Sequence, residues 1–367
     1  MKSQPIRRIE PIKGGMQMKK KRFLPLLGSL LLVFVMLAST SITAYAQQPI
    51  KLRVNLPGSP TTGHVITNTE LFKKIEAACK GRVEISFYTG TLLGPPTENY
   101  QMVKSGVVDI SGCILGFFPG QFPLTEFLYL PFLGLSNAEM GSRVFWGLYE
   151  KFPEFKSEFS GVKVLHLDTD APCIIGTNKP IRKLEDLKGL KMRTLTGNPM
   201  EMMKAVGAIP VAIAPVDAYT SMERKVIDGW VWSWEGSVGH KVDELTEYFT
   251  VVSTYQPAFG NFMNLAAWNK LPPDIQKIFD QHSGDFGSAF LGKGTDHYNQ
   301  IAREKIQANK NKKINYLSPE ETKRWQEACK PIWDKWVANV EAKGLPGKAL
   351  FQEARKLQEK FAAEPKK

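Results

Sequence analysis

The sequence has little of the residue chemistry that identifies common enzyme classes. Its five histidines form no H-E-x-x-H motif and no close pair. It contains no G-x-S-x-G motif, no P-loop and no G-x-G-x-x-G, so the signals for serine hydrolases, nucleotide binding and Rossmann cofactors are missing. We therefore expect no catalytic residue, no metal and no cofactor in this chain.

Cysteine is also scarce. The sequence has four cysteines: Cys79, Cys113, Cys173 and Cys329. They form no C-x-x-C motif, so neither thioredoxin-like nor zinc-ribbon chemistry is indicated. In an exported chain they can oxidise, and all three pairings of four cysteines stay open. Cys79 and Cys329 lie in amphipathic helical patterns and fit half-buried thiols.

One short stretch holds several metal-ligating residue types. In the run from His166 to Asp170, a histidine and two aspartates stand at alternating positions. Metal sites are recognised by the number and geometry of their ligands, and alternation alone is a weak signal. We interpret the run as the end of a strand with solvent-facing polar groups, not as a metal site.

The N-terminal region has the three parts of a secretory signal. The basic run at 19–22 precedes an uncharged apolar run of about 16 residues, which is short for a membrane span, and small residues follow at 44–46. We predict that residues 1–46 are a signal peptide cleaved after Ala46, with an uncleaved anchor as the alternative. The start of translation is open between Met1, Met16 and Met18.

A strong charge of one sign is absent once this segment is removed. The whole chain has a formal net charge of +12, and residues 1–46 hold eight of its basic and one of its acidic residues, which leaves +5. Nucleic-acid binding is expected to show a clustered basic face. This mild excess of positive charge therefore predicts no nucleic-acid partner.

What is present is an alternation of strand and helix patterns. The first series reads as strand 50–54, helix 64–81, strand 82–88, turn and helix 89–106, strand 107–110 and, further on, helix 137–151. A second series starts with strand 162–167 and continues with strand 191–193, helix 200–206, strand 209–211, helix 216–223 and strand 226–230. From Pro272 onward the pattern is helical. Two α/β units finished by helices predict two lobes, and clefts between such lobes bind small ligands.

Five stretches, taken together and in order, resemble the periplasmic substrate-binding proteins of TRAP transporters, the DctP-type family. They are YTGTLLGPPTENYQMVKSGVVDI (88–110), FPLTEFLYLPFLG (122–134), TNKPIRKLEDLKGLKMRTL (177–195), VGAIPVAIAPVDAYTSMERKVIDG (206–229) and FMNLAAWNKLPPDIQKIF (262–279). The likeness covers about residues 50 to 340. Its most specific parts are the L-K-G-L-K-M-R strand and the V-G-A-x-P-V run.

The resemblance implies a bilobal periplasmic-binding-protein-like α/β fold, with a ligand cleft between two α/β domains and a helical C-terminal region. The lobes would be 47–170 with about 258–298, and 171–257 with about 299–345, followed by a C-terminal tail or helix at 346–367. It also implies a periplasmic protein, a small organic acid as ligand and delivery to small and large TRAP membrane subunits. A monomer is expected, although some members dimerise.

The resemblance further implies that Arg193, in the family's K-x-R position, holds the ligand's carboxylate. A guanidinium offers two parallel N–H donors that fit a carboxylate's two oxygens. Cys173 falls where sialic-acid-binding members carry a second arginine, and an aromatic run replaces their Q-E-N residues. Further candidate ligand-binding residues are Trp232, Asn55, Leu115, Phe117 and Pro215. Alternation predicts that Trp230, Trp232 and Trp234 share one strand face.

With one charge anchor and apolar residues facing it, the site is expected to take a monocarboxylate with an apolar or aromatic body. The alternative ligand is a C4-dicarboxylate, because Lys179, Arg182 or Arg224 could reach the cleft. The alternative function is a secreted enzyme that uses the same cleft, with Cys113 or Cys173 as nucleophile. No histidine is placed by the sequence to serve as the base that such a cysteine needs.

Overall fold

The computed structural model describes residues 48–364. The signal-peptide prediction for residues 1–46 therefore lies outside the described residues, and so do residues 365–367. Among the described residues, every helix is too short or too polar to span a bilayer. The strands of this part of the chain form two separate sheets, of five and six strands.

The first sheet has the strand order β2-β1-β3-β10-β4. Its β1 pairs in parallel with β2 and β3, whereas β10 runs antiparallel to β3 and β4. The strands are β1 (Ile50–Leu56), β2 (Val83–Thr89), β3 (Ile110–Ile114), β4 (Val162–Thr169) and β10 (Ala258–Asn264). The helices near it are α2 (Gly63–Ala78), α3 (Asn99–Ser105), α4 (Ala138–Lys151), α5 (Pro153–Glu158), α9 (Leu265–Lys270) and α10 (Pro273–Gln281). We call this half lobe I.

The second sheet has the strand order β11-β9-β5-β8-β6-β7 and defines lobe II. Its β6 pairs in parallel with β7 and β8, and β5 runs antiparallel to β8 and β9. The strands are β5 (Ile174–Thr177), β6 (Lys191–Thr194), β7 (Ile209–Ala212), β8 (Gly229–Trp232), β9 (Tyr248–Val251) and β11 (Lys313–Tyr316). Its short helices are α6 (Asn198–Ala205), α7 (Ala218–Glu223) and α8 (Trp234–Gly239). The bilobal α/β fold predicted from the sequence is confirmed.

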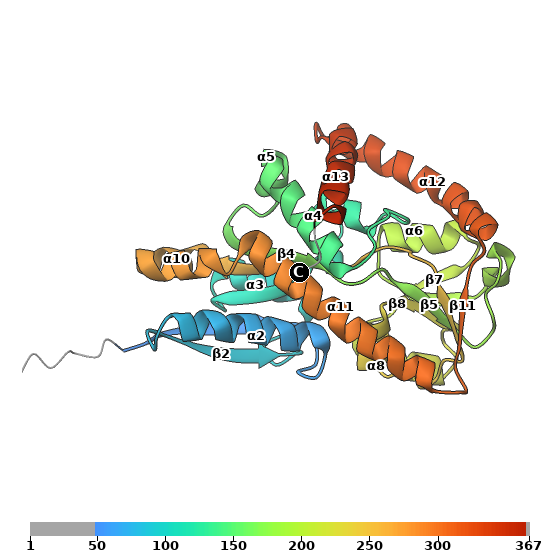
Figure 1. Cartoon of the computed structure of the whole chain (residues 1–367), viewed down its shortest axis with the longest axis horizontal. Helices are drawn as coiled ribbons and strands as arrows, with labels where there is room; N and C mark the ends of the chain where they lie inside the picture. The colour runs from blue at the N-terminus through green and yellow to red at the C-terminus, as the bar shows by residue number, and fades with distance from the viewer. Residues whose placement is uncertain (1–47, 365–367) are drawn as a thin grey trace, which may run out of the picture. The chain divides into compact units, whose positions relative to one another are not determined.

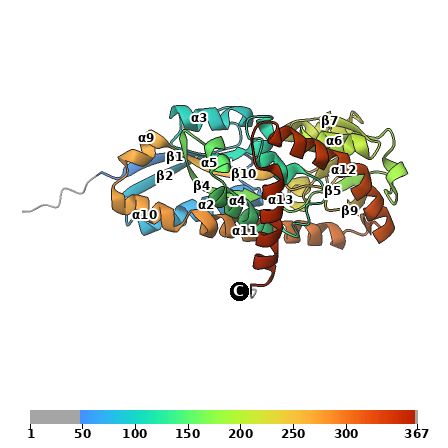
Figure 2. The ribbon, with the colours of Figure 1, turned by 90° about the horizontal axis from the view of Figure 1, so that it is seen from above.

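Two chain segments and one long helix connect the lobes. Residues 170–173 lead from β4 to β5, and residues 252–257 lead from β9 to β10. Helix α11 (Gly284–Ala308) packs against α2, α4 and β4 of lobe I and against α8 of lobe II (Figure 1). Helices α12 (Pro319–Glu341) and α13 (Gly347–Ala362) follow it, with α13 lying against α4 (Figure 2). The lobe boundaries predicted at residue resolution stay a prediction.

Arg193 stands at the carboxyl end of a central strand, and local chemistry explains why the strand ends there. Gly189, with a φ of +76°, turns the chain into β6 in a conformation that other residues rarely adopt. Gly197, with a φ of +73°, turns it out again, and α6 begins beside Pro199. In open α/β sheets the carboxyl ends of strands are where ligands bind.

Several sequence predictions need correction. The strand predicted at residues 107–110 begins only at Ile110, because Gly106 ends α3 in the left-handed region and the next residues form its C-terminal turn. Trp234 does not continue the face of Trp230 and Trp232, since β8 ends at Trp232 and Ser233 caps α8. The chain is not all helical from Pro272 onward, because residues 313–316 pair with β9 as β11. Cys79 and Cys329 are fully buried, not half-buried.

Candidate functional site

A cavity of about 90 Å³ lies between the two lobes. Lobe I lines it with the β1–α2 loop, the start of α2, the end of β3 and part of β10. Lobe II lines it with β6, β8 and α8, and the segments that connect the lobes complete the wall. Five of the seven predicted site residues line this cavity: Arg193, Trp232, Cys173, Phe117 and Pro215.

The other two predicted residues do not line this cavity. Asn55 is buried inside lobe I, where its amide donates to Asn99 Oδ1 at 3.0 Å and to Ser111 Oγ at 3.4 Å. Leu115 lines a smaller hollow beside Gly116 and Tyr129. The structure thus brings together the residues around Arg193 and leaves Asn55 and Leu115 in packing positions.

Arg193 is buried with its charge uncompensated by any described residue. It is 2% exposed, and its guanidinium forms no ion pair with a carboxylate of residues 48–364. Nε donates to the carbonyl of Ile213 at 3.2 Å, and Nη1 lies 3.5 Å from the carbonyl of Val231. Burial lowers the pKa of Arg193 to about 10, so the guanidinium still carries its charge at neutral pH.

An aromatic stack holds the guanidinium in place. Its carbon lies 3.7 Å from the centre of a Trp232 ring, close enough for a cation–π contact. His240 stacks against Trp232, with ring centroids 4.6 Å apart. Burial and the charge of Arg193 lower the pKa of His240 to about 4, so its imidazole is neutral at pH 7 and adds no second cation.

Cys173 lies in the same wall but is poorly suited to nucleophilic chemistry. It is a free, buried thiol, and burial raises its pKa well above the usual value. Cys113 does not line the cavity, and burial raises its pKa as well. Since the thiolate is the nucleophilic form, neither cysteine has the environment of an activated one. Among the described residues all four cysteines are free.

The structure also brings polar residues to the cavity that the sequence analysis did not assign to it. They are Thr62, His64, Asp170, Glu235, His240 and Tyr255. The run from His166 to Asp170 is buried, with His166 and Asp168 at 0% exposure, so its interpretation as solvent-facing was wrong. No group of three metal-ligating side chains among the described residues is placed to hold a metal ion.

His64, which lines the cavity, forms a polar pair with Asp168, which is buried and does not line it. His64 Nε2 lies 2.9 Å from Asp168 Oδ2, and the imidazole packs on Phe259 with ring centroids 4.3 Å apart. Burial alone would lower the pKa of His64. The charge of Asp168, its hydrogen bond and the more distant Asp170 and Glu235 outweigh that effect and raise it.

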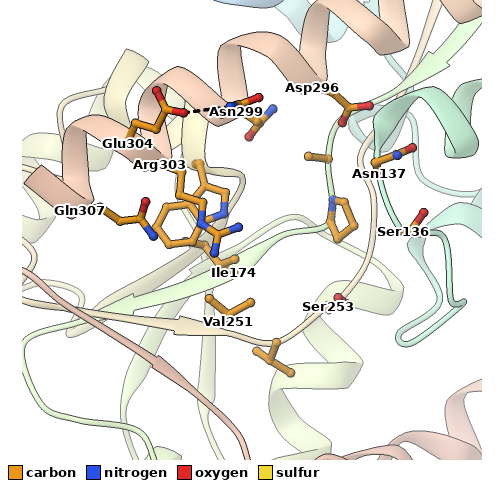
Figure 3. Close-up of a pocket in the computed structure, with 15 residues that line it drawn as sticks. Ser136, Asn137, Ile174, Val251, Ser253, Asp296, Asn299, Arg303, Glu304 and Gln307 are labelled. Carbon is orange, nitrogen blue, oxygen red and sulfur yellow. Dashed lines mark hydrogen bonds between the residues drawn. The ribbon is translucent and has the colours of Figure 1, made fainter. Parts of the chain in front are cut away.

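A larger cavity of about 480 Å³ lies beside the segments that connect the lobes (Figure 3). Arg303, in its wall, donates to the Tyr316 hydroxyl at 2.6 Å, although its Nε is buried without a partner among the described residues. Asp296 accepts from the backbone N–H groups of Ala138 and Glu139 at 2.8 and 3.0 Å. Arg303 is only half-buried, whereas Arg193 is 2% exposed and has no carboxylate partner among the described residues, so we assign the ligand site to the smaller cavity.

Comparisons with known proteins identify the family. Residues 58–339 match the family of bacterial extracellular solute-binding proteins, family 7 (DctP). A TRAP solute-binding protein from Rhodoferax ferrireducens T118, solved with copurified benzoate, is 30% identical, with a TM-score of 0.81 over 85% of this chain and 98% of that one.

Two further proteins are similar over most of their length. A marine metagenome TRAP solute-binding protein from an unidentified microbe, specific for aromatic acid ligands and solved with metahydroxyphenylacetate, is 27% identical. Its TM-score is 0.80 over 85% of this chain and 99% of that one. The C4-dicarboxylate-binding periplasmic protein DctP of Rhodobacter capsulatus is 24% identical over 87% of this chain and 96% of its own length.

Proposed function

This chain belongs to the bacterial extracellular solute-binding proteins of family 7, the DctP family of TRAP transporters, and we propose that it captures a small organic acid through Arg193. It does so in the periplasm, after removal of residues 1–46, and delivers the acid to the TRAP membrane subunits. We propose for the lobes the boundaries given in the sequence analysis. Transport, not catalysis, is the role of the cleft.

The observation that carries this proposal is the unpaired buried charge of Arg193. An isolated ion costs several kcal/mol to remove from water, and a partner of opposite charge offsets that cost. A ligand carboxylate supplies this partner and meets two parallel N–H donors of the guanidinium. Removing the carboxylate from the ligand or the guanidinium from the protein leaves the other group buried and unpaired.

The cavity wall indicates what the rest of the acid is. Apolar side chains surround the guanidinium on both lobes: Ile114, Phe117, Leu195, Pro215, Trp232 and Phe259. An aromatic ring or branched chain gains roughly 25 cal/mol for each Å² of apolar surface that it buries there. The two solved relatives, bound to benzoate and to metahydroxyphenylacetate, support the same preference. We propose a monocarboxylate with an aromatic or apolar body.

A C4-dicarboxylate, the ligand class in the name of the Rhodobacter capsulatus relative, is the alternative. Lys179, Arg182 and Arg224 do not line the cavity, so they do not supply a second cation there. Asp170 and Glu235 do line it, and their carboxylates oppose another negative charge. These observations favour the monocarboxylate.

The test is a calorimetric titration of the protein with benzoate and with succinate, followed by competition between them. We expect benzoate to bind more tightly by about tenfold or more, since a second buried carboxylate costs more than 1.4 kcal/mol. Tighter binding of succinate would overturn the proposed ligand class. Conversion of either acid to a product would overturn the proposal of transport without catalysis.

A further inference from the structure

Two acidic residues, Asp170 and Glu235, line the cavity that holds Arg193, and a third, Asp168, lies next to the lining residue His64. Asp168 is 0% exposed, and its second carboxylate oxygen, Oδ1, is buried without a hydrogen-bond partner among the described residues. Its Oδ2 holds the imidazole of His64. Asp170 directly follows the end of β4 and lines the cavity, whereas Asp168 does not line it. Acidic side chains thus lie around one imidazole of this wall.

Both carboxylate oxygens of Asp170 already accept hydrogen bonds in this arrangement. Its Oδ1 accepts from the backbone N–H of Ala171 at 2.8 Å and from the amide of Asn299 at 3.2 Å. Its Oδ2 accepts from the hydroxyl of Ser233 at 2.7 Å. The same hydroxyl caps α8 by accepting from the backbone N–H of Gly236 at 3.1 Å. Asp170 thus fixes the start of α8 and serves the fold.

Glu235, the second residue of α8, is different because only half of its carboxylate is occupied. Its Oε1 accepts from the backbone N–H of Gly63 in lobe I at 2.8 Å. Its backbone N–H donates to Asn299 Oδ1 at 3.0 Å, which fixes the residue's position. Oε2 has no hydrogen-bond partner among residues 48–364. A carboxylate oxygen that lines a cavity and has no partner is an acceptor for a ligand's donor.

The acidic side chains of the cavity do not neutralise Arg193. Its guanidinium forms no ion pair with a carboxylate of residues 48–364, and the uncharged Cys173 and Tyr255 lie near it. The charges of Asp170 and Glu235 act instead on His64. The cavity therefore offers a cation on one side and hydrogen-bond acceptors on another, with the apolar rings of Trp232 and Phe259 forming part of the wall.

We propose that Glu235 selects ligands that carry a hydrogen-bond donor on the body of the acid, so that the preferred substrates are hydroxyl-substituted aromatic monocarboxylates. This inference rests on the proposed function and adds a specificity-determining residue to it. The hydroxyl donates to Glu235 Oε2, while the carboxylate binds Arg193. Sites built to bond a substrate hydroxyl discriminate strongly against analogues without it, because their own polar group is left unpaired.

The test measures binding of benzoate and of 2-, 3- and 4-hydroxybenzoate by calorimetry. Burial and the charge of Asp170 raise the pKa of Glu235 to about 7, so the titration is done at pH 8, where the carboxylate is mostly ionised. We expect at least one hydroxybenzoate isomer to bind about tenfold more tightly than benzoate, as a hydrogen bond to a charged group predicts. In Glu235→Gln this ratio should fall to about threefold or less. The matched control, Glu223→Gln, changes an exposed glutamate that does not line the cavity and should keep the ratio. Thermal unfolding of both variants checks that they fold.

The possible failures are distinguishable. If benzoate binds but no hydroxybenzoate isomer binds more tightly, the role of Glu235 is wrong and the proposed function stands. If Glu235→Gln is folded and keeps the preference for the hydroxyl, the role is also wrong. If none of the four acids binds the wild-type protein, the proposed ligand class fails together with this inference.

Discussion

Arg193 is held by weak contacts for a side chain that carries a full charge. Its two backbone acceptors leave most of its five N–H donors free, and Trp232 contributes a face instead of a counter-charge. Such a residue costs stability in the ligand-free protein and recovers that cost when a carboxylate arrives. The affinity of the site should therefore depend on the shape of this group as well as on its charge.

Two substitutions separate charge from shape. Arg193→Ala should abolish binding of benzoate, and Arg193→Lys should weaken it at least about tenfold, because an ammonium cannot form the paired N–H bonds of a guanidinium. Calorimetry on both variants measures this. Arg224→Lys, at an exposed arginine of lobe II outside the cavity, is the control and should bind as the wild type does. Near-normal affinity in Arg193→Ala would contradict the assignment of the anchor.

The raised pKa of Glu158 makes the free energy of unfolding depend on pH, independently of the ligand. Glu158 is half-buried and accepts hydrogen bonds from the backbone N–H groups of Leu124 and Thr125 and from the Thr125 hydroxyl. Burial raises its pKa to about 7, although those bonds act in the opposite direction. Between the unfolded value near 4.5 and about 7, the folded protein holds a proton that the unfolded chain releases.

Raising the pH through that window must therefore lower the free energy of unfolding. Relative to Glu158→Gln, the wild type should lose about 1–3 kcal/mol between pH 5 and pH 8. Urea denaturation of both proteins at several pH values measures the difference and cancels the titration of other groups. Parallel profiles for the two proteins would show that Glu158 is ionised in the folded state at pH 5.

At the residue scale, the sequence predicted what local motifs encode. Arg193 was predicted because its strand end resembles the family's K-x-R position. Phe117, Cys173, Pro215 and Trp232 were predicted from the same resemblance, because they fall at or near pocket positions of that family. Glu235 could not be found in this way. Its position depends on the bond to Gly63, a residue 172 positions earlier in the chain, and on Ser233 starting a helix where strand alternation was expected.

At the scale of elements, the C-terminal helices connect parts of both lobes. Helix α12 packs against α6 in lobe II, and α13 packs against α4 in lobe I. Phe351 of α13 lies in an aromatic cluster with Trp333 and Trp336 of α12 and with Phe127, at ring-centroid distances of 4.8, 5.6 and 4.9 Å. Aromatic pairs at such distances add to the energy of area burial. The pair of helices is therefore part of the core.

Phe351→Ala should lower the free energy of unfolding by about 2 kcal/mol, below the range for a fully buried phenylalanine because Phe351 is half-buried. Denaturant unfolding measures this. Phe286→Ala provides the control, since Phe286 is 51% exposed and should change stability by about 0.5 kcal/mol or less. Benzoate affinity should stay within about twofold of wild type in both variants, because neither residue lines the cavity. If both substitutions changed the free energy of unfolding equally, α13 would not be part of the core.

The strong periodicity of hydrophobic residues made most helices and strands predictable. The predictions of where these elements begin and end were less accurate. Helix α2 and strand β1 fall where spacing placed them. The strand expected at residues 107–110 starts later, because the turn after Gly106 uses the same valines that an alternating pattern would assign to a strand. Capping and turn bonds between neighbouring residues decide such ends, and hydrophobic spacing does not report them.

At the scale of the whole ligand-binding unit, the site is assembled from two lobes that meet through few polar contacts. Besides the bond between Glu235 and Gly63, Thr196 Oγ1 donates to the carbonyl of Gly116 at 3.3 Å and the Asn198 amide donates to that of Glu126 at 3.3 Å. A typical hydrogen bond contributes only about 0.5–1.5 kcal/mol to stability. These polar contacts therefore add little to the cost of separating the lobes.

Separation is also required for entry, since Arg193 is 2% exposed and Trp232 is 9% exposed in this arrangement. The segments at 170–173 and 252–257 lie between the sheets and can act as hinges while each sheet stays intact. We predict that the ligand-free protein in solution is more open than this structure and that benzoate closes it. Its carboxylate stabilises the closed arrangement because only there is Arg193 both buried and paired.

Small-angle scattering with and without saturating benzoate tests this prediction. The radius of gyration, about 20 Å for a compact unit of this size, should fall when the ligand is added. Arg193→Ala should show no such fall at the same benzoate concentration, which controls for effects of the acid on the solvent. An unchanged radius in the wild type, at a concentration where calorimetry shows full occupancy, would mean that the lobes do not close on the ligand. Entry would then have to depend on side-chain movements at Trp232 and its neighbours, and the hinge segments would be rigid connections.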